Sequence, residues 1–218
     1  MLSKLLKKEF RLCLHPTAPL MMLLSALTLV PNYPYGVMYF YLTLGFFFIC
    51  LGGRENHDVT YSMTLPVSRR DIVIGRIGMF VLLELIQLVL AGVFVCLRGV
   101  ILRGAPNAAG MDANLVLLAN GFLYYSVFHL TFLPAYYKDV NKVGTAFVKS
   151  SVAMFVLVVL EIIATHAVPF VRDVLDTPDP AHLGAKLFFF AICTVIYAVV
   201  LALSVRLSLR RFARQDIR

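Results

Sequence analysis

The fold is decided by apolar stretches such as RIGMFVLLELIQLVLAGVFVCL, residues 76–97, in which only Arg76 and Glu84 carry charge. As an α-helix, with a rise of about 1.5 Å per residue, this stretch would be about 33 Å long. The hydrocarbon core of a bilayer is about 30 Å thick, and a span needs about 20 mainly apolar residues. Residues 76–97 are therefore predicted to form a membrane-spanning helix.

Five further apolar stretches accompany this one. Of the 218 residues, 60% are hydrophobic and only 15% are charged, which is more apolar than a soluble domain can be. The predicted spans are 17–30, 35–51, 76–97, 115–137, 147–168 and 184–205. The first would be only about 21 Å long as a helix, and it is interpreted either as a short or tilted span or as a re-entrant hairpin with the second. We therefore predict an all-α integral membrane protein with six transmembrane helices.

The chain is expected to form one transmembrane domain over residues 1–218, without a sizeable soluble domain. Its expected parts are an interfacial helix at 1–16, spans one and two at 17–51, a cytoplasmic loop at 52–75, spans three to six at 76–205, and a basic cytoplasmic tail at 206–218.

The Lys and Arg residues predict the orientation, because cytoplasmic loops accumulate them. All but four of the 20 basic residues precede the first span, lie between spans two and three or four and five, or belong to the tail. The other four, Arg98, Arg103, Arg172 and Lys186, lie among acidic residues. Both termini are therefore expected in the cytoplasm. The net charge of +8 is interpreted as topology and contact with anionic membrane lipids, and it does not indicate nucleic-acid binding.

The N-terminal residues are expected to form an amphipathic helix in the membrane interface. Leu and Cys side chains share one helical face between residues 2 and 13, and four basic side chains occupy the other, which is typical of an interfacial helix. Glu9 falls within the apolar face. Its carboxylate either contacts protein or extends to water, and the sequence leaves both interpretations open.

Catalytic and nucleotide-binding motifs are missing from the sequence. The chain contains no H-E-x-x-H, no G-x-S-x-G and no G-x-x-x-x-G-K-[ST], the signatures of zinc proteases, serine hydrolases and phosphate-binding loops. The four cysteines have no C-x-x-C spacing and indicate neither a metal site nor a disulfide framework. We therefore expect that the chain is not an enzyme and binds no cofactor. If ATP drives it, another subunit must bind the nucleotide.

The loop GGRENHDVTYSMTLPVSRRDIVIGR, residues 52–76, contains its own structural signals. A short helix is predicted at Val59–Leu65, ended by Pro66. Ser68, with Asp71 three residues later, resembles a capping box that starts the third span. A short helix between two long ones suits the transfer of rigid-body motion to a docked protein, whereas a merely solvated connector is the alternative.

The predicted short helix has an apolar centre and a charged rim. The centre is formed by Val59, Tyr61, Met63 and Leu65, and the rim by Glu55, Asp58, Arg69 and Arg70. Interface energy concentrates in a few buried aromatic or apolar anchors. Tyr61 is therefore the expected anchor of a protein contact.

Ionisable and amide side chains inside the predicted spans are the remaining candidates, because such groups are costly in a membrane and by default mark a site. They are Glu84, Gln87, Asn120, His129 and Glu161. One interpretation is hydrogen bonding between helices. The other is a substrate path whose carboxylates receive the positive groups of a cationic substrate.

The sequence resembles the type-2 ABC exporter permeases, specifically the small six-span kind that includes bacterial exporters of antimicrobial and toxin peptides. The resemblance rests on TLPVSRRDIV at 64–73, KKEF at 7–10 and LPAYYK at 133–138, and together with the layout of the spans it covers the whole chain. Asp139 departs from the pattern, where a Gly is expected after Lys138.

This resemblance implies a multi-pass permease of the bacterial plasma membrane. The implied partners are a second permease, either an identical copy or a sister subunit, and cytoplasmic ATPase subunits that hold ATP and Mg. The residues that the resemblance assigns to ATPase coupling are Val59, Thr60, Tyr61, Ser62, Met63, Thr64, Leu65 and Glu9. ATP binding would then move the spans and expel an amphipathic or hydrophobic substrate, such as a peptide toxin, an antimicrobial peptide or a drug, from the cytoplasm or the inner leaflet. The alternative class is a non-transport membrane component, such as an immunity, sensor or assembly protein.

Overall fold

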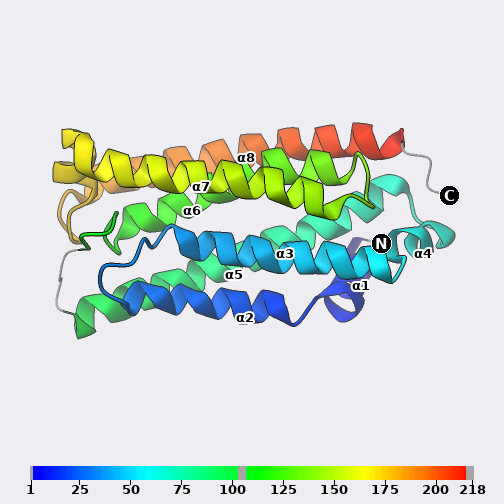
Figure 1. The fold of residues 1–218 in the computed structure, drawn as a ribbon, viewed down its shortest axis with the longest axis horizontal. Coiled ribbons are helices and arrows are strands. Elements are labelled where there is room, and N and C mark those ends of the chain that lie inside the picture. Colours follow the sequence, from blue (N-terminus) through cyan, green and yellow to red (C-terminus); the bar gives the residue numbers. More distant parts are fainter. Residues whose placement is uncertain (1, 103–106, 215–218) are drawn as a thin grey trace.

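The computed structural model describes residues 2–102 and 107–214, and helices form the whole framework of these ranges (Figure 1). The long helices are α3 (Val37–Glu55), α5 (Arg69–Ile101), α6 (Leu115–Tyr136), α7 (Val143–Ala167) and α8 (Leu183–Ala213). The short ones are α1 (Leu2–Lys8), η1 (Glu9–Cys13), α2 (Thr17–Leu23), η2 (Leu24–Leu29), α4 (Asp58–Thr64) and η3 (Val171–Leu175). Five helices are long and apolar enough to cross a membrane, or up to six if the bent N-terminal pair is one span. The predicted all-α integral membrane fold is confirmed.

The N-terminal segment bends sharply before it enters the bundle. Residues 4–13 meet residues 17–29 at an angle of 86°, as expected where a helix in the membrane interface leads into a span. The second arm, α2 with the 3-10 helix η2, runs antiparallel to α3 (Figure 1). It ends at Leu29 and is only about 22 Å long, so the weakest predicted stretch is indeed the shortest.

Helix α5 begins earlier than the apolar stretch that predicted it. The Ser68 hydroxyl accepts from the Asp71 amide and the Asp71 carboxylate accepts from the Ser68 amide, which confirms the capping box. The helix therefore starts at Arg69 and continues for 33 residues, about 50 Å. This length exceeds the thickness of the hydrocarbon core, and α5 also contacts α4.

Helix α6 is the centre of the bundle. Two thirds (67%) of its most apolar window is buried, compared with 28% or less for α5, α7 and α8, and it packs chiefly against α7 and α8. On its other side, the Tyr39 hydroxyl of α3 donates to the Leu117 carbonyl at 2.9 Å. Phe46 of α3 stacks on Phe80 of α5 with ring centroids 4.2 Å apart. Aromatic contacts therefore join α3 to both neighbours.

Two loops are joined at the end of the bundle opposite α4. The side-chain oxygen Oδ1 of Asn114 caps α6 by accepting from the backbone amides of Val116 and Leu117, while the side-chain nitrogen Nδ2 donates to the Leu175 carbonyl at 2.8 Å. The Asp112 amide donates to Asp176 at 2.6 Å. The segment before α6 is thus fastened to η3 and the turn that follows it.

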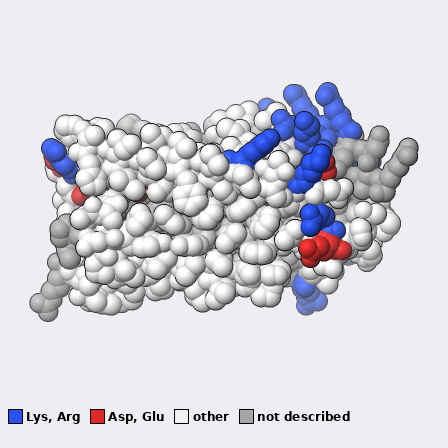
Figure 2. All heavy atoms as spheres, viewed as in Figure 1, with Lys and Arg blue, Asp and Glu red and all other residues white. Residues whose placement is uncertain are grey.

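Basic side chains gather at one end of the molecule. Figure 2 shows most Lys and Arg side chains at the end that holds α4 and the C-terminal end of α8, and few at the opposite end. The long surface between the two ends is almost free of charge in this view. This distribution matches the separation on which the predicted orientation depends.

The close packing of α2 on α3 requires a glycine. A Cβ at Gly45 would lie 2.7 Å from the Ala18 Cα, and Ala18 is fully buried. Gly45→Ala should therefore push the two helices apart and lower the unfolding free energy by about 1–3 kcal/mol, as overpacking does. Thermal unfolding of the purified protein in detergent measures this. Gly52→Ala, in the same helix and with nothing within 4 Å of the added Cβ, is the control and should not destabilise. Equal losses in both variants would contradict the described packing.

Candidate coupling site

Helix α4 has an inward and an outward face. It spans Asp58–Thr64, one residue earlier than predicted, and it ends before Pro66 as expected. Val59 and Ser62 are buried against the rest of the chain, and Met63 is half-buried. Thr60 and Thr64 are exposed, as is Tyr61 at 56%. The expected apolar centre is therefore divided, because Val59 and Met63 pack inward and Tyr61 points outward, while Leu65 lies just beyond the helix and is half-buried.

A buried guanidinium holds α4 in place. Arg76 of α5 is only 4% exposed, and it donates from Nε to Glu9 Oε2 and from Nη2 to Asp58 Oδ2. Glu9 lies in η1 and is 2% exposed, and Asp58 is the first residue of α4. The planar fork of arginine suits simultaneous contacts with carboxylates. One side chain of α5 thus contacts both η1, which is distant in sequence, and α4.

Lys8 completes this site. Its ammonium donates to Asp58 Oδ1 at 2.7 Å, to Ser62 Oγ at 2.6 Å and to Glu9 Oε1 at 3.3 Å. We call Lys8, Glu9, Asp58 and Arg76 the ionic cluster. Its two cations and two carboxylates balance one another, which is the condition under which buried charges are tolerated.

Asp58 and Lys8 stay charged over a wide pH range. Burial acts to raise the pKa of Asp58, but Arg76 and Lys8 outweigh it and hold this pKa below 3.8. Burial acts to lower the pKa of Lys8, but the hydrogen bond to Asp58 and the charges of Glu9 and Asp58 raise it above 10.5. Asp58 therefore stabilises the fold above its ordinary pKa and loses this effect as pH falls through the lowered pKa, while Lys8 stabilises below its ordinary pKa and loses the effect as pH rises through the raised one. Both contributions are present at neutral pH.

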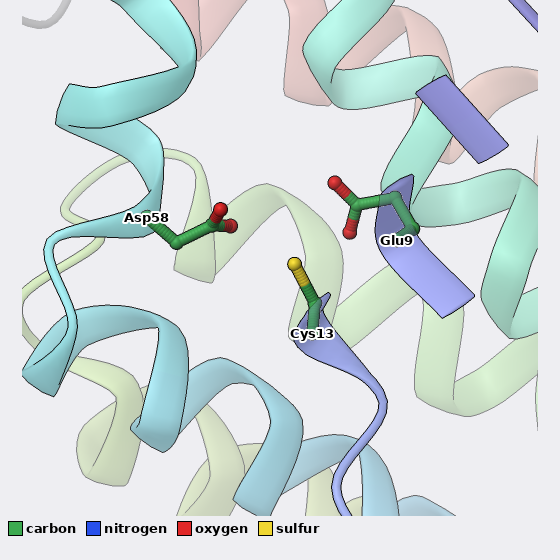
Figure 3. Close-up of side chains that lie close together, drawn as sticks. All are labelled: Glu9, Cys13 and Asp58. Carbon is green, nitrogen blue, oxygen red and sulfur yellow. The ribbon is translucent and has the colours of Figure 1, made fainter. Parts of the chain in front are cut away.

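Part of this site has the composition of a metal centre. Glu9, Cys13 and Asp58 point toward one another (Figure 3), and their ligand atoms lie within 4.8 Å. However, both carboxylates are already paired with Arg76 and Lys8. Burial also raises the pKa of the Cys13 thiol to about 12, whereas a metal requires the thiolate. The donor set therefore favours an ionic cluster over a bound divalent cation.

The candidates inside the spans do not form a single site. Glu84 of α5 is 1% exposed; His129 Nε2 of α6 lies 2.8 Å from its Oε1, and the Tyr197 hydroxyl of α8 donates to its Oε2 at 2.6 Å. Gln87, one turn further along α5, donates to the Met38 carbonyl at 3.0 Å. These contacts join α5 to α3, α6 and α8, which is what the interpretation as interhelical hydrogen bonds expects.

Glu161 and Asn120 lie apart from Glu84 and Gln87. The Tyr124 hydroxyl of α6 donates to Glu161 Oε2 of α7 at 2.5 Å. The Asn120 amide lies 3.3 Å from the Met111 sulfur. Both residues line the same cavity near the end of the bundle opposite α4.

Sequence reasoning identified Glu9 but missed its partners. In the sequence, Arg76 and Lys8 indicate only the orientation of the chain, and Asp58 indicates only the charged rim of the predicted short helix. The usable signals were a carboxylate on the apolar face of the N-terminal helix and an arginine at the beginning of an apolar stretch, because each is costly without an opposite charge. Their pairing joins residues 67 positions apart, and no local pattern indicates it.

Loss of the central guanidinium should destabilise the fold. Arg76→Gln leaves Glu9 buried without a full countercharge, which typically costs about 3–5 kcal/mol. Thermal unfolding should show this loss, and limited trypsin digestion should show faster cleavage at Arg69 and Arg70 as α4 detaches. The control is Arg54→Gln, whose contact with Glu55 is exposed and worth less than about 1 kcal/mol. An Arg76→Gln variant as stable as the Arg54→Gln variant would contradict the role of the cluster.

The chain is similar to known proteins at the level of a family. No curated protein and no solved structure matches the chain. A family model described as ABC-2 family transporter protein matches residues 4–213, which include α4, the ionic cluster and every long helix. A protein of this family is a membrane component and not the catalytic subunit, and an ATPase partner is implied. The chain therefore belongs to the ABC-2 transporter family and is a permease component of an ABC transporter.

Proposed function

We propose that this permease belongs to an ATP-driven exporter in which separate ATPase subunits hydrolyse ATP and α4 is the coupling helix. The observation that carries the proposal is the ionic cluster, which ties α4 to α5 through Arg76. The outward face of α4 presents Thr60, Tyr61 and Thr64 to a partner. A partner that grips this face thereby holds the end of a helix about 50 Å long.

The coupling follows from the cost of separating these charges. For α4 to move independently of α5, Asp58 must leave both Arg76 and Lys8, and breaking a buried ion pair costs about 3–5 kcal/mol. Glu9 binds the same guanidinium, so the N-terminal helix is subject to the same constraint. A force applied to α4 is therefore transmitted to α5 and η1 as a rigid-body movement. The ATP and Mg would be held by the partner ATPase.

The proposed cargo is an amphipathic or hydrophobic molecule, such as a peptide toxin, an antimicrobial peptide or a drug, taken from the cytoplasm or the inner leaflet. A second permease, identical or a sister subunit, would complete the pathway. The proposed location is the bacterial plasma membrane, with both termini in the cytoplasm and anionic lipids around the basic end. A non-transport component, such as an immunity, sensor or assembly protein, is the competing function, and it requires no nucleotide-stimulated cycle.

The proposed orientation places α4 in the cytoplasm. In a cysteine-free version, Ala181→Cys and Asn141→Cys introduce exposed thiols at opposite ends of the bundle. An impermeant thiol reagent applied to intact cells should label position 181 and not position 141, whereas both should react after lysis. The reverse pattern in intact cells would overturn the orientation.

Tyr61 is the proposed anchor of the ATPase contact. Truncating such an anchor typically costs about 2 kcal/mol, roughly thirtyfold in affinity. Tyr61→Ala should therefore insert and fold normally, because its side chain is exposed, yet lose co-purification with the ATPase and substrate-stimulated ATP hydrolysis.

Two controls accompany the Tyr61 variant. Asn56→Ala changes an exposed residue in the turn before α4 and should leave both properties intact. Val59→Ala removes a buried contact of the same helix and, unlike Tyr61→Ala, should lower the thermal stability of the chain. Unchanged ATPase association and stimulation in Tyr61→Ala would exclude α4 as the coupling helix. A wild-type chain that never associates with an ATPase would favour the non-transport alternative.

A further inference from the structure

A cavity of about 260 Å³ lies between α6, α7 and η3. Its lining residues are Met111, Val116, Asn120, Leu123, Tyr124, Leu157, Leu160, Glu161, Ala164, Val171, Leu175 and Phe189. Nine of these twelve side chains are apolar, and the exceptions are Asn120, Tyr124 and Glu161. The volume is just below the range of about 300–1,000 Å³ for small-molecule pockets, so it suits an alkyl chain or a few apolar side chains, and not a whole peptide.

The cavity wall contains a carboxylate without a countercharge. Among the residues that the structure describes, no Lys, Arg or His nitrogen lies within 4 Å of the Glu161 carboxylate, whereas its Oε2 accepts from the Tyr124 hydroxyl. A carboxylate in apolar surroundings is costly unless it is paired. The site therefore lacks the positive group that would complete it.

The backbone at Gly36 covers one side of the hydrogen-bonded pair formed by Tyr124 and Glu161. A Cβ at Gly36 would lie 2.3 Å from the Tyr124 hydroxyl oxygen and 2.9 Å from Glu161 Oε2, so the backbone before α3 packs directly against both polar groups. The carboxylate is consequently covered from α3 and faces the cavity from α7. A ligand can approach it from the cavity.

We propose that this cavity binds a primary ammonium group carried on an apolar chain, with the ammonium at Glu161 and the chain against Val116, Leu157 and Leu160. The inference rests on the proposed function, for which it names the substrate class: an amphipathic cation. Charge attraction in apolar surroundings is stronger than in water, so the carboxylate discriminates in favour of the amine. The apolar lining supplies affinity for any chain of the same length.

The test separates these two contributions. The purified chain in phosphatidylcholine nanodiscs is titrated with radiolabelled dodecylamine and, in parallel, with radiolabelled dodecanol, and the binding to empty nanodiscs is subtracted. The wild-type protein should bind the amine at least tenfold more tightly than the alcohol. Because no ATPase or nucleotide is present, the result is independent of whether α4 couples to a partner.

Three variants assign the binding to the cavity. Glu161→Gln keeps the shape and removes the charge, so the preference for the amine should disappear while dodecanol binding stays. Ala164→Phe fills the cavity and should abolish the binding of both probes. Tyr124→Phe removes the hydroxyl and keeps the carboxylate, so the preference should remain, and this variant also tests the inference if Glu161→Gln fails to fold. Asp173→Asn, exposed at the same end of the bundle, is the matched control and should bind as the wild type does.

Each of the following three results would overturn the proposal. A preference for dodecylamine that persists in a folded Glu161→Gln variant would show that the carboxylate does not bind the ammonium. Undiminished binding in Ala164→Phe would place the probes elsewhere on the protein. Loss of the preference in a folded Tyr124→Phe variant would show that the Glu161 carboxylate does not by itself select the amine.

Discussion

A guanidinium buried between two carboxylates constrains the whole end of the molecule at which α4 lies. Arg76 cannot remain in an apolar environment unless Glu9 and Asp58 both reach it, and each belongs to a different element. This contact depends on the bend of the N-terminal segment, on the position of α4 and on the extension of α5 beyond the apolar stretch. Lys8 balances the charge, because without it the cluster would hold two carboxylates and one cation.

The interior of the bundle follows a different rule. There, polar side chains form hydrogen bonds between helices, as Glu84 does with His129 and Tyr197, and aromatic packing around α6 fills the remaining space. Glu161 departs from this rule because one side of its carboxylate faces a cavity. A rigid connection at one end and a mainly apolar cavity with a carboxylate in its wall at the other suit a protein that moves as a unit around a ligand, as the proposed export function requires.

Much of the fold could be predicted from the sequence because it is encoded locally. Apolar length marks the spans, Pro66 ends α4, and Ser68 with Asp71 starts α5. The start of α5 was missed by hydropathy because its first residues are charged and lie outside the apolar stretch. The inward position of Val59 and the partners of Glu9 and Arg76 could not be predicted, since they depend on contacts between residues distant in sequence. The cavity at Glu161 likewise requires η3, which could not be predicted because it lies outside the apolar stretches.

The central claim is that α4 and α5 move as one body. The distance between the two helices during the ATP cycle tests this claim most directly. Spin labels at Thr64 of α4 and Leu82 of α5, both exposed, report this distance by double electron–electron resonance in the transporter assembled with its ATPase. If the two helices move as one body, the distance distribution should be equally narrow with and without bound nucleotide, and it should broaden in Arg76→Gln. A distance that changes with nucleotide in the otherwise unmodified chain would show that α4 moves independently of α5 and would contradict the claim.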